Sequence, residues 1–224
     1  MADTLEARVQ TVVVFDVETT GLNCAKNEII EFGAVKAALS DLSAEREQSD
    51  FLIRLPEGVP LPADITRLTG ITEDALQAEG ISQADACERI VRFLDADNLL
   101  LAAYNAQFDL CFLYYFLKRF GKEDILRRIA FLDILTVYRD RRAFPHKLSD
   151  AVAAYRVKTA NTHRAIDDAR AALELLHLME QEENDLHHYV NLFGFHPKYG
   201  VSGPKISTIT YRAQSLDASG RLYR

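Results

Sequence analysis

The stretch Thr11-Val12-Val13-Val14-Phe15-Asp16-Val17-Glu18-Thr19-Thr20-Gly21-Leu22 decides the fold of this chain. It begins with a run of β-branched and apolar residues, which favours a strand buried on both faces. The run ends at Asp16 and Glu18, and a Thr-Thr-Gly turn follows. The stretch therefore predicts a central strand whose carboxyl end carries acidic side chains.

Outward from this strand, the chain is expected to form strands first and then to alternate strands with helices. Residues 40–47 are expected to be a polar turn and residues 56–72 an irregular surface segment, while Thr72 and Ser82 are expected helix N-caps. Further strands are expected at 28–39, 48–55, 99–103 and 128–132, and helices at 106–120, 134–142, 148–155 and 165–182. This order predicts an α/β fold with a five-stranded mixed sheet and helices on both faces.

Asp16 and Glu18 are two residues apart, so a strand places both side chains on one face. Two unit charges about 4 Å apart repel by about 4 kcal/mol at an effective dielectric of 20, and a cation or a proton must compensate them. Carboxylate oxygens are hard ligands, which favour Mg²⁺ or Mn²⁺ over Zn²⁺. The pair indicates a metal site, against the alternative of a polar strand end that enters a turn.

A second segment, Tyr104-Asn105-Ala106-Gln107-Phe108-Asp109, directly follows the expected strand 99–103. Loops at the carboxyl ends of such strands are where α/β sheets place their sites. Asn105 and Asp109 are four residues apart, so one helical face can direct both toward the first pair of acids. The alternative is structural, with Asn105 capping the helix and Asp109 in its first turn, where the helix dipole favours an acid.

A third segment, Thr162-His163-Arg164-Ala165-Ile166-Asp167-Asp168-Ala169, leads into the last long helix. An imidazole exchanges its proton near neutral pH, so His163 suits the removal of a proton from water. The alternative is a surface histidine beside an aspartate that begins a helix. Periodicity alone leaves the choice between Asp167 and Asp168 open.

Composition favours a single soluble domain. The chain has 224 residues, 48% of them apolar, and neither a long apolar run nor a secretory signal pattern is present. The three cysteines form no CxxC pair, which argues against a disulfide framework and a zinc site and favours a reducing, cytoplasmic location. The formal net charge of -7 weighs against a protein that binds polyanions tightly over a large surface.

Three groups of residues receive structural interpretations. The aromatic residues between Tyr104 and Phe116 are expected to be mostly core. His187, His188 and His196 are expected on the surface. The basic run Arg139, Arg141, Arg142 and Lys147 is expected to form a solvated face, with a backbone-contacting role in nucleic-acid binding as the alternative.

Taken together, the three segments resemble the DEDDh family of 3′–5′ exonucleases, especially the proofreading epsilon subunit and the PolC exonuclease domain of bacterial DNA polymerase III. The resemblance runs from residue 12 to about residue 180 and follows the family's order, with FDVETTGL, YNAQFD and HRAIDD as its three motifs. Residues 65–72, Ile-Thr-Arg-Leu-Thr-Gly-Ile-Thr, are similar to the family's linker. The His-x-x-x-x-Asp spacing of the family selects Asp168 over Asp167.

The resemblance implies a ribonuclease H-like fold and a two-metal mechanism. Two Mg²⁺ or Mn²⁺ ions would be held by four acids, with His163 as the general base that activates water and a nucleoside 5′-monophosphate as product. The implied metal ligands are Asp16, Glu18, Asp109 and Asp168. The implied substrate contacts are Thr19, Thr20, Gly21, Leu22, Ile71, Asn105 and Phe108, with Leu22 and Ile71 flanking the terminal base and ordinary packing as the alternative for the apolar residues.

Residues 1–184 are expected to form the exonuclease domain. Residues 185–224 are expected to be a C-terminal extension that packs on the domain or on a partner, as a substrate clamp, a dimer arm or a polymerase-docking segment. DNA 3′ ends are the preferred substrate, in proofreading or repair, with a DNA polymerase subunit as a possible partner and a homodimer also open. An RNA-trimming exoribonuclease of the same superfamily and a non-catalytic scaffold that binds nucleic-acid ends are the competing functions.

Overall fold

A computed structural model describes residues 9–201, 203–217 and 220–224. Its main sheet has five strands in the order β3-β2-β1-β4-β5. β2 is antiparallel to both of its neighbours, β1 and β3, whereas β4 is parallel to both β1 and β5. The strands are β1 (Thr11–Thr19), β2 (Ile29–Ala38), β3 (Asp41–Leu52), β4 (Leu99–Ala103) and β5 (Ala130–Asp133). The expected five-stranded mixed sheet is confirmed.

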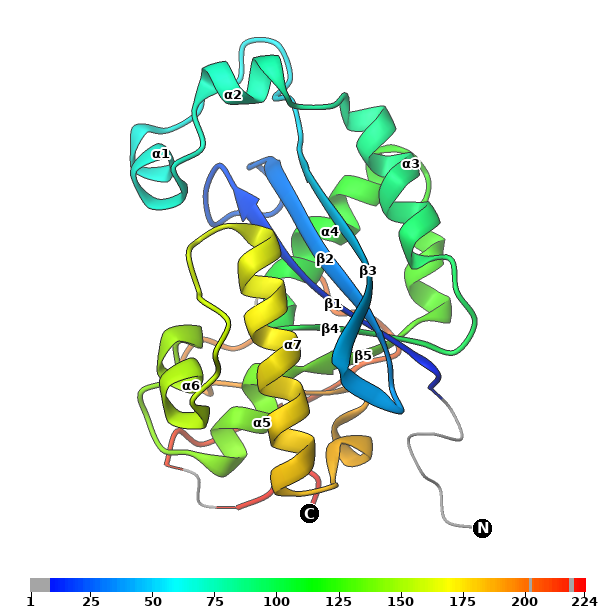
Figure 1. Ribbon diagram of the computed structural model, residues 1–224, viewed down its shortest axis with the longest axis vertical. Helices are drawn as coiled ribbons and strands as arrows, with labels where there is room; N and C mark the ends of the chain where they lie inside the picture. Colours follow the sequence, from blue (N-terminus) through cyan, green and yellow to red (C-terminus); the bar gives the residue numbers. More distant parts are fainter. Residues whose placement is uncertain (1–8, 202, 218–219) are drawn as a thin grey trace.

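Helices cover both faces of this sheet (Figure 1). They are α1 (Ala63–Thr69), α2 (Glu73–Ala78), α3 (Gln83–Leu94), α4 (Ala106–Arg119), α5 (Ile134–Arg141), α6 (Leu148–Tyr155) and α7 (Ala165–Glu182), with the 3₁₀ helices η2 (Glu123–Arg128) and η3 (Leu186–Tyr189). Thr72 and Ser82 accept hydrogen bonds at the starts of α2 and α3, as expected of N-caps. None of the helices in the described residues is long and apolar enough to cross a membrane.

The central strand β1 divides the core into two layers because its side chains alternate between the two faces of the sheet. Val13 and Phe15 pack in the cluster that contains residues of α3 and α4. Val12 and Val14 pack in the cluster that contains residues of α5 and α7. Both faces of β1 are therefore buried, as its continuous apolar sequence predicts.

Two predictions about the region between β2 and α2 are wrong. Residues 40–47 are mostly strand and not turn, since β3 runs from Asp41 to Leu52 at the edge of the sheet. An edge strand tolerates polar side chains on both faces, so β3 lacks the apolar alternation that would have revealed it. The expected irregular segment 56–72 contains the short helix α1, which ends at Gly70 in a left-handed conformation.

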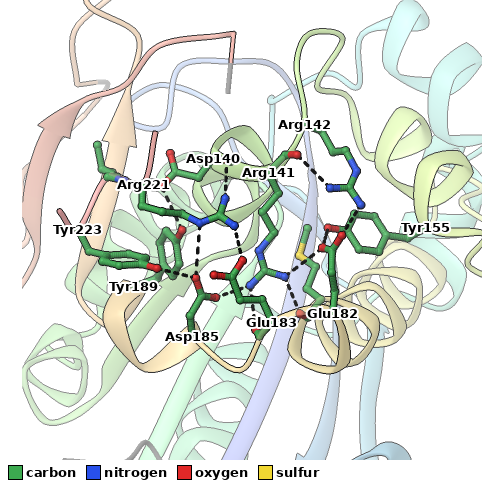
Figure 2. A network of polar contacts seen from close by, with 12 residues as sticks. Asp140, Arg141, Arg142, Tyr155, Glu182, Glu183, Asp185, Tyr189, Arg221 and Tyr223 are labelled. Carbon is green, nitrogen blue, oxygen red and sulfur yellow. Dashed lines mark hydrogen bonds and ion pairs between the residues drawn. The ribbon is translucent and has the colours of Figure 1, made fainter. Parts of the chain in front are cut away.

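The C-terminal part of the chain packs on β5, α5 and the end of α7. Its strands β6 (Leu192–Phe195) and β7 (Thr210–Ala213) form a separate parallel pair. Figure 2 shows the polar network that fastens the end of the chain: Arg221 donates to the Asp140 carbonyl (2.7 Å) and Tyr223 donates to Asp185 (2.9 Å). Arg141 pairs with Asp185 inside this network, its side chain 1% exposed, so the expectation of a solvated face is wrong for Arg141.

The prediction that the cysteines form no disulfide is also corrected. Cys24, in the loop after β1, is bonded to Cys111 of α4, with 5.8 Å between the Cα atoms. The two are 87 residues apart in the chain, and only the packing of that loop against α4 brings them together. Cys87 is free and buried.

Candidate active site

The carboxyl end of β1 carries two acidic side chains toward the start of α7. Asp16 and Glu18 continue the alternation of Val12 and Val14, which pack on the α7 side of the sheet. Asp16, Glu18 and Asp168 each offer one carboxylate oxygen, and these three oxygens all lie within 4.8 Å of one another. Oxygens that share one Mg²⁺ each lie about 2 Å from it, so this spacing is close to that of a metal site.

Asp109 reaches the same end of β1 from the other layer of the core. Strand β4 pairs with β1 only from Thr11 to Val14, so the last part of β1 extends beyond β4. There the N–H of Val17 donates to Oδ1 of Asp109, at 3.3 Å. This backbone bond holds the Asp109 carboxylate, which is 2% exposed, beside the strand that carries Asp16 and Glu18.

The start of α7 separates the two neighbouring aspartates. Thr162 donates its N–H to Asp168 (3.0 Å) and its hydroxyl to Asp167 (2.7 Å). Asp168 is 7% exposed and joins the cluster of acids, whereas no such cluster among the described residues contains Asp167. His163 is exposed and adopts a left-handed backbone (φ 59°). Burial raises the pKa of Asp168, and hydrogen bonds from Asn161 and from the backbone of Thr162 and His163 oppose part of that rise.

Glu31 is a fifth acid at this site, and the sequence analysis missed it. It lies opposite Glu18 in the register of β1 and β2, and it is fully buried. Its carboxylate accepts hydrogen bonds from Arg164 Nε (2.8 Å), Arg164 Nη2 (2.6 Å) and the N–H of Ala165 (3.0 Å). Glu31 therefore binds the first residues of α7 to the sheet. A single acid among the apolar residues at the start of this strand was the signal that could have revealed it.

Gly33 permits this close contact between α7 and β2. It lies opposite Asp16 in the strand register, and a Cβ atom added there would lie 2.2 Å from the backbone of Ala165 and Ile166. Such a distance is far inside van der Waals contact, and main-chain atoms cannot turn aside as a flexible side chain can. The absence of a side chain at Gly33 lets the first turn of α7, with Asp168, reach the end of β1.

The pKa values of all four predicted metal ligands are raised, and burial is the largest cause at each. The charges of Asp109, Glu18 and Asp168 raise the pKa of Asp16 further. Burial, followed by the charges of Glu31 and Asp168, raises the pKa of Glu18 to about 8. The cluster therefore favours a proton or a cation near neutral pH, and its set of oxygen donors fits a hard divalent cation.

Of the predicted substrate residues around the turn after β1, Leu22 is exposed, whereas Thr19 and Thr20 are buried. Leu22 is 88% exposed. The Thr19 hydroxyl donates to the Gly21 carbonyl (2.7 Å), and the Thr20 hydroxyl accepts the N–H of Glu28 (2.9 Å). Ile71 is 4% exposed and packs with Ile30 and Leu76. The two threonines thus close the turn, and Ile71 lies in a small core cluster.

Asn105 does not cap α4 with its side chain. It occupies the N-cap position in a left-handed conformation (φ 67°), and Asp133 accepts the N–H of Ala106 in its place, at 2.9 Å. The amide of Asn105 instead lines a cleft of about 620 Å³, within the usual size of ligand pockets. Leu22 and Phe108 line the same cleft, together with Arg139, His196 and Tyr199.

Known proteins resemble the chain over most of its length. The RNase_T family model, whose description is exonuclease, matches residues 13–176. PolC-type DNA polymerase III of Caldanaerobacter subterraneus is 33% identical over 168 residues, 73% of this chain and 11% of that protein. The corresponding protein of Clostridium perfringens is 34% identical over 183 residues, 78% of this chain and 12% of the relative. The chain thus spans about an eighth of the length of these relatives.

Solved structures confirm the expected ribonuclease H-like fold. Escherichia coli exonuclease I, in a zinc-bound complex with single-stranded DNA, aligns with a TM-score of 0.70 and 20% identity over 81% of this chain and 42% of that chain. Exonuclease I of Methylocaldum szegediense aligns with a TM-score of 0.69 and 19% identity over 80% of this chain and 42% of that chain. By its match to the family model over most of its sheet and helices, the chain belongs to the RNase_T exonuclease family.

Proposed function

We propose that this chain hydrolyses the terminal phosphodiester bond at the 3′ end of DNA and releases a nucleoside 5′-monophosphate. The observation that carries the proposal is the meeting of Asp16, Glu18 and Asp168 within 4.8 Å, with Asp109 bonded to the same stretch of β1. Membership of the exonuclease family supports a nuclease, and an oxygen-rich acidic cluster is the donor set that phosphoryl-transfer enzymes use to hold cations.

Two Mg²⁺ or Mn²⁺ ions are the cofactors that this donor set fits, with Asp16, Glu18, Asp109 and Asp168 as ligands. When bound, the ions supply positive charge that stabilises the attacking and leaving oxygens of an in-line displacement. The chain's own contribution is to fix the carboxylates. Val17 holds Asp109, Thr162 holds Asp168, and the bonds from Glu31 to Arg164 and Ala165 anchor the start of α7.

His163 is the proposed general base. Its exposed side chain is next to Asp168 and is free to face a water molecule that attacks the terminal phosphorus. The imidazole takes a proton from that water as the new phosphorus–oxygen bond forms and the bond to the 3′ oxygen of the preceding nucleotide breaks. Thr19, Thr20, Gly21 and Leu22 are proposed to contact the terminal nucleotide with Asn105 and Phe108, and Ile71 to support this turn from the core.

DNA is preferred over RNA as the substrate because the curated relatives are PolC-type DNA polymerases. In proofreading this domain would act together with a DNA polymerase, whereas in repair it would act alone or as a homodimer. An exoribonuclease and a non-catalytic scaffold remain the alternatives. Intact acids at all four positions, with His163 beside them, favour catalysis over a scaffold.

A time course on 5′-labelled oligonucleotides tests this function. Single-stranded DNA with Mg²⁺ or Mn²⁺ should shorten one nucleotide at a time from the 3′ end, release mononucleotides and stop with EDTA. A matched RNA oligonucleotide should be degraded more slowly. Faster RNA hydrolysis would favour the exoribonuclease, and protein that is inert with both metals would favour the scaffold.

Replacement of the proposed base tests the mechanism. His163→Ala should lower kcat by about 10²- to 10⁴-fold, the usual contribution of a general base, with the affinity for Mn²⁺ largely retained. His177→Ala, on the distant part of α7, is the control and should keep wild-type turnover. Unchanged turnover in His163→Ala would remove this residue from the mechanism.

The raised pKa of Glu18 predicts a pH-dependent stability in EDTA. Its folded-state pKa of about 8 lies above the ordinary value of 4.5, so its proton stabilises the fold below pH 4.5, and that stabilisation is lost as pH rises through 8. The Tm of the wild type should therefore fall relative to Glu18→Gln between pH 5 and pH 9, by at least about 4 °C.

Divalent cations should reverse this loss because they replace the proton as the compensating charge. Addition of Mg²⁺ or Mn²⁺ should raise the wild-type Tm more at pH 8 than at pH 5, and should raise that of Glu18→Gln less. A Tm difference between wild type and variant that stays constant with pH would contradict the assignment, as would a cation effect that is the same at both pH values.

A further inference from the structure

The cleft that Leu22, Asn105 and Phe108 line has one wall built from the C-terminal extension. Phe195, His196, Tyr199, Gly200 and Gly203 line this wall, and they lie beyond residue 176, where the match to the exonuclease family ends. The opposite wall contains Leu22, Asn105 and Phe108, the proposed contacts of the terminal nucleotide. The cleft therefore lies between the proposed contacts of the terminal nucleotide and the C-terminal segment.

Hydrogen bonds to the main sheet and to α5 fix the position of this wall. Asn191 bonds Phe131 of β5 twice, through its backbone N–H (2.7 Å) and its side-chain oxygen (2.8 Å). The N–H of Gly194 donates to the Thr136 hydroxyl (2.8 Å), and Gln214 donates to the Thr136 carbonyl (2.8 Å). These bonds are at the base of β6, whose last residue leads directly into the wall.

The buried network of Figure 2 holds the far end of the same segment. Asp140 of α5 accepts the hydroxyl of Tyr189 (3.0 Å), as Figure 2 shows. Asp140 also accepts the side-chain amide of Gln214 (2.7 Å). Arg221 bonds the carbonyl of Asp140 and the carboxylate of Glu183. Because both ends of the extension are anchored, the wall between them is a fixed part of the cleft.

The chemistry of the cleft suits unpaired nucleotides. Tyr199 is 73% exposed, its ring centroid lies 5.0 Å from that of His196, and the amine of Lys198 lies 5.4 Å from its ring. Exposed aromatic rings beside amines are the usual platform for stacking single-stranded bases. Arg139 also lines the cleft, and its guanidinium is a suitable donor to a phosphate oxygen.

The charge of the segment favours a polyanion over a second protein copy. From Leu186 to the C-terminus the sequence contains Lys198, Lys205, Arg212, Arg221 and Arg224 against the single acid Asp217, in a chain of net charge -7. Lys198 and Lys205 are exposed. A basic segment beside an acidic body would attract a strand of nucleic acid toward the cleft.

We propose that this cleft binds the single strand upstream of the scissile bond, with Tyr199 and His196 stacked on a base and Arg139 bonded to a backbone phosphate. The inference rests on the proposed function for its substrate class. It assigns to residues 194–200 and Gly203 the role of a strand-binding wall that lies outside the family's matched region. The terminal nucleotide remains beside the acids, and the cleft selects strands with unpaired upstream bases.

Binding to a 5′-fluorescein-labelled single-stranded dT12, measured by anisotropy in Ca²⁺, tests the cleft without depending on turnover. Tyr199→Ala should weaken binding by about 5- to 100-fold, the usual effect of losing one stacked base. Phe144→Ala is the matched control, since Phe144 is 72% exposed and outside the cleft lining, and it should bind within about 2-fold of wild type. Arg139→Gln should lower the slope of log affinity against log salt by about 0.7, the loss of one phosphate contact.

Turnover of the p-nitrophenyl ester of thymidine 5′-monophosphate separates the two proposals because this substrate has no upstream nucleotide. Tyr199→Ala should raise the KM for dT12 far more than the KM for this ester. Wild-type protein that hydrolyses neither substrate would contradict the proposed function. The anisotropy measurement would still test whether the cleft binds single-stranded DNA.

Equal dT12 affinity in wild type and a folded Tyr199→Ala would overturn the inference. So would equally tight binding of a blunt duplex. Sedimentation provides a further check on the occupant. If Tyr199→Ala dissociates a dimer and leaves DNA affinity unchanged, the cleft is a self-association surface and the strand-binding proposal fails.

Discussion

Repulsion among buried carboxylates is the constraint on which the rest of this structure depends. Two unit charges 4 Å apart repel by about 4 kcal/mol at an effective dielectric of 20, and burial makes each charge more costly. Asp16, Glu18 and Asp168 meet within 4.8 Å, and fully buried Glu31 lies opposite Glu18 in the sheet. A fold retains such a cluster only if other interactions hold it and a proton or cation offsets its charge.

Those other interactions come from elements far apart in the sequence. β1 extends beyond β4, which frees the N–H of Val17 for Asp109. Gly33 gives α7 the room to approach β2, and Glu31 then binds Arg164 and Ala165 at the start of that helix. One of the five acids is thus neutralised by an arginine and a backbone amide, which leaves the other four to share the proposed cations.

The sequence revealed the parts of this arrangement that depend on local pattern. The apolar run before Asp16 predicts β1 because a strand buried on both faces needs continuous apolar residues. Residues 99–103 and 165–182 form the expected strand and helix with unchanged bounds. The meeting of Asp16 with Asp168 was expected from the family resemblance, since periodicity could not choose between Asp167 and Asp168. In the structure Asp168 lies in the cluster of acids, and Thr162 bonds the two aspartates through separate groups.

The parts that the sequence did not reveal depend on contacts between distant residues. In the sequence Glu31 is an acid within a strand, and only the structure shows its partner Arg164. Cys24 lies near Cys111 only because the loop after β1 packs on α4. The predicted strand at 48–55 lacked the first part of β3 because an edge strand exposes polar residues on both faces. The C-terminal wall of the cleft has no periodic pattern of its own, and its position follows from Thr136, Asp140 and the buried Arg141.

Four acids on three separate elements, β1, α4 and α7, are proposed to form one site for a pair of divalent cations. A calorimetric titration with Mn²⁺ at pH 8 measures this most directly, with Asp168→Asn compared against the neighbouring Asp167→Asn. We expect about two ions per chain for the wild type and for Asp167→Asn, and the loss of at least one ion in Asp168→Asn. Wild-type protein that binds no Mn²⁺, or two variants that bind it equally, would contradict the proposed metal site.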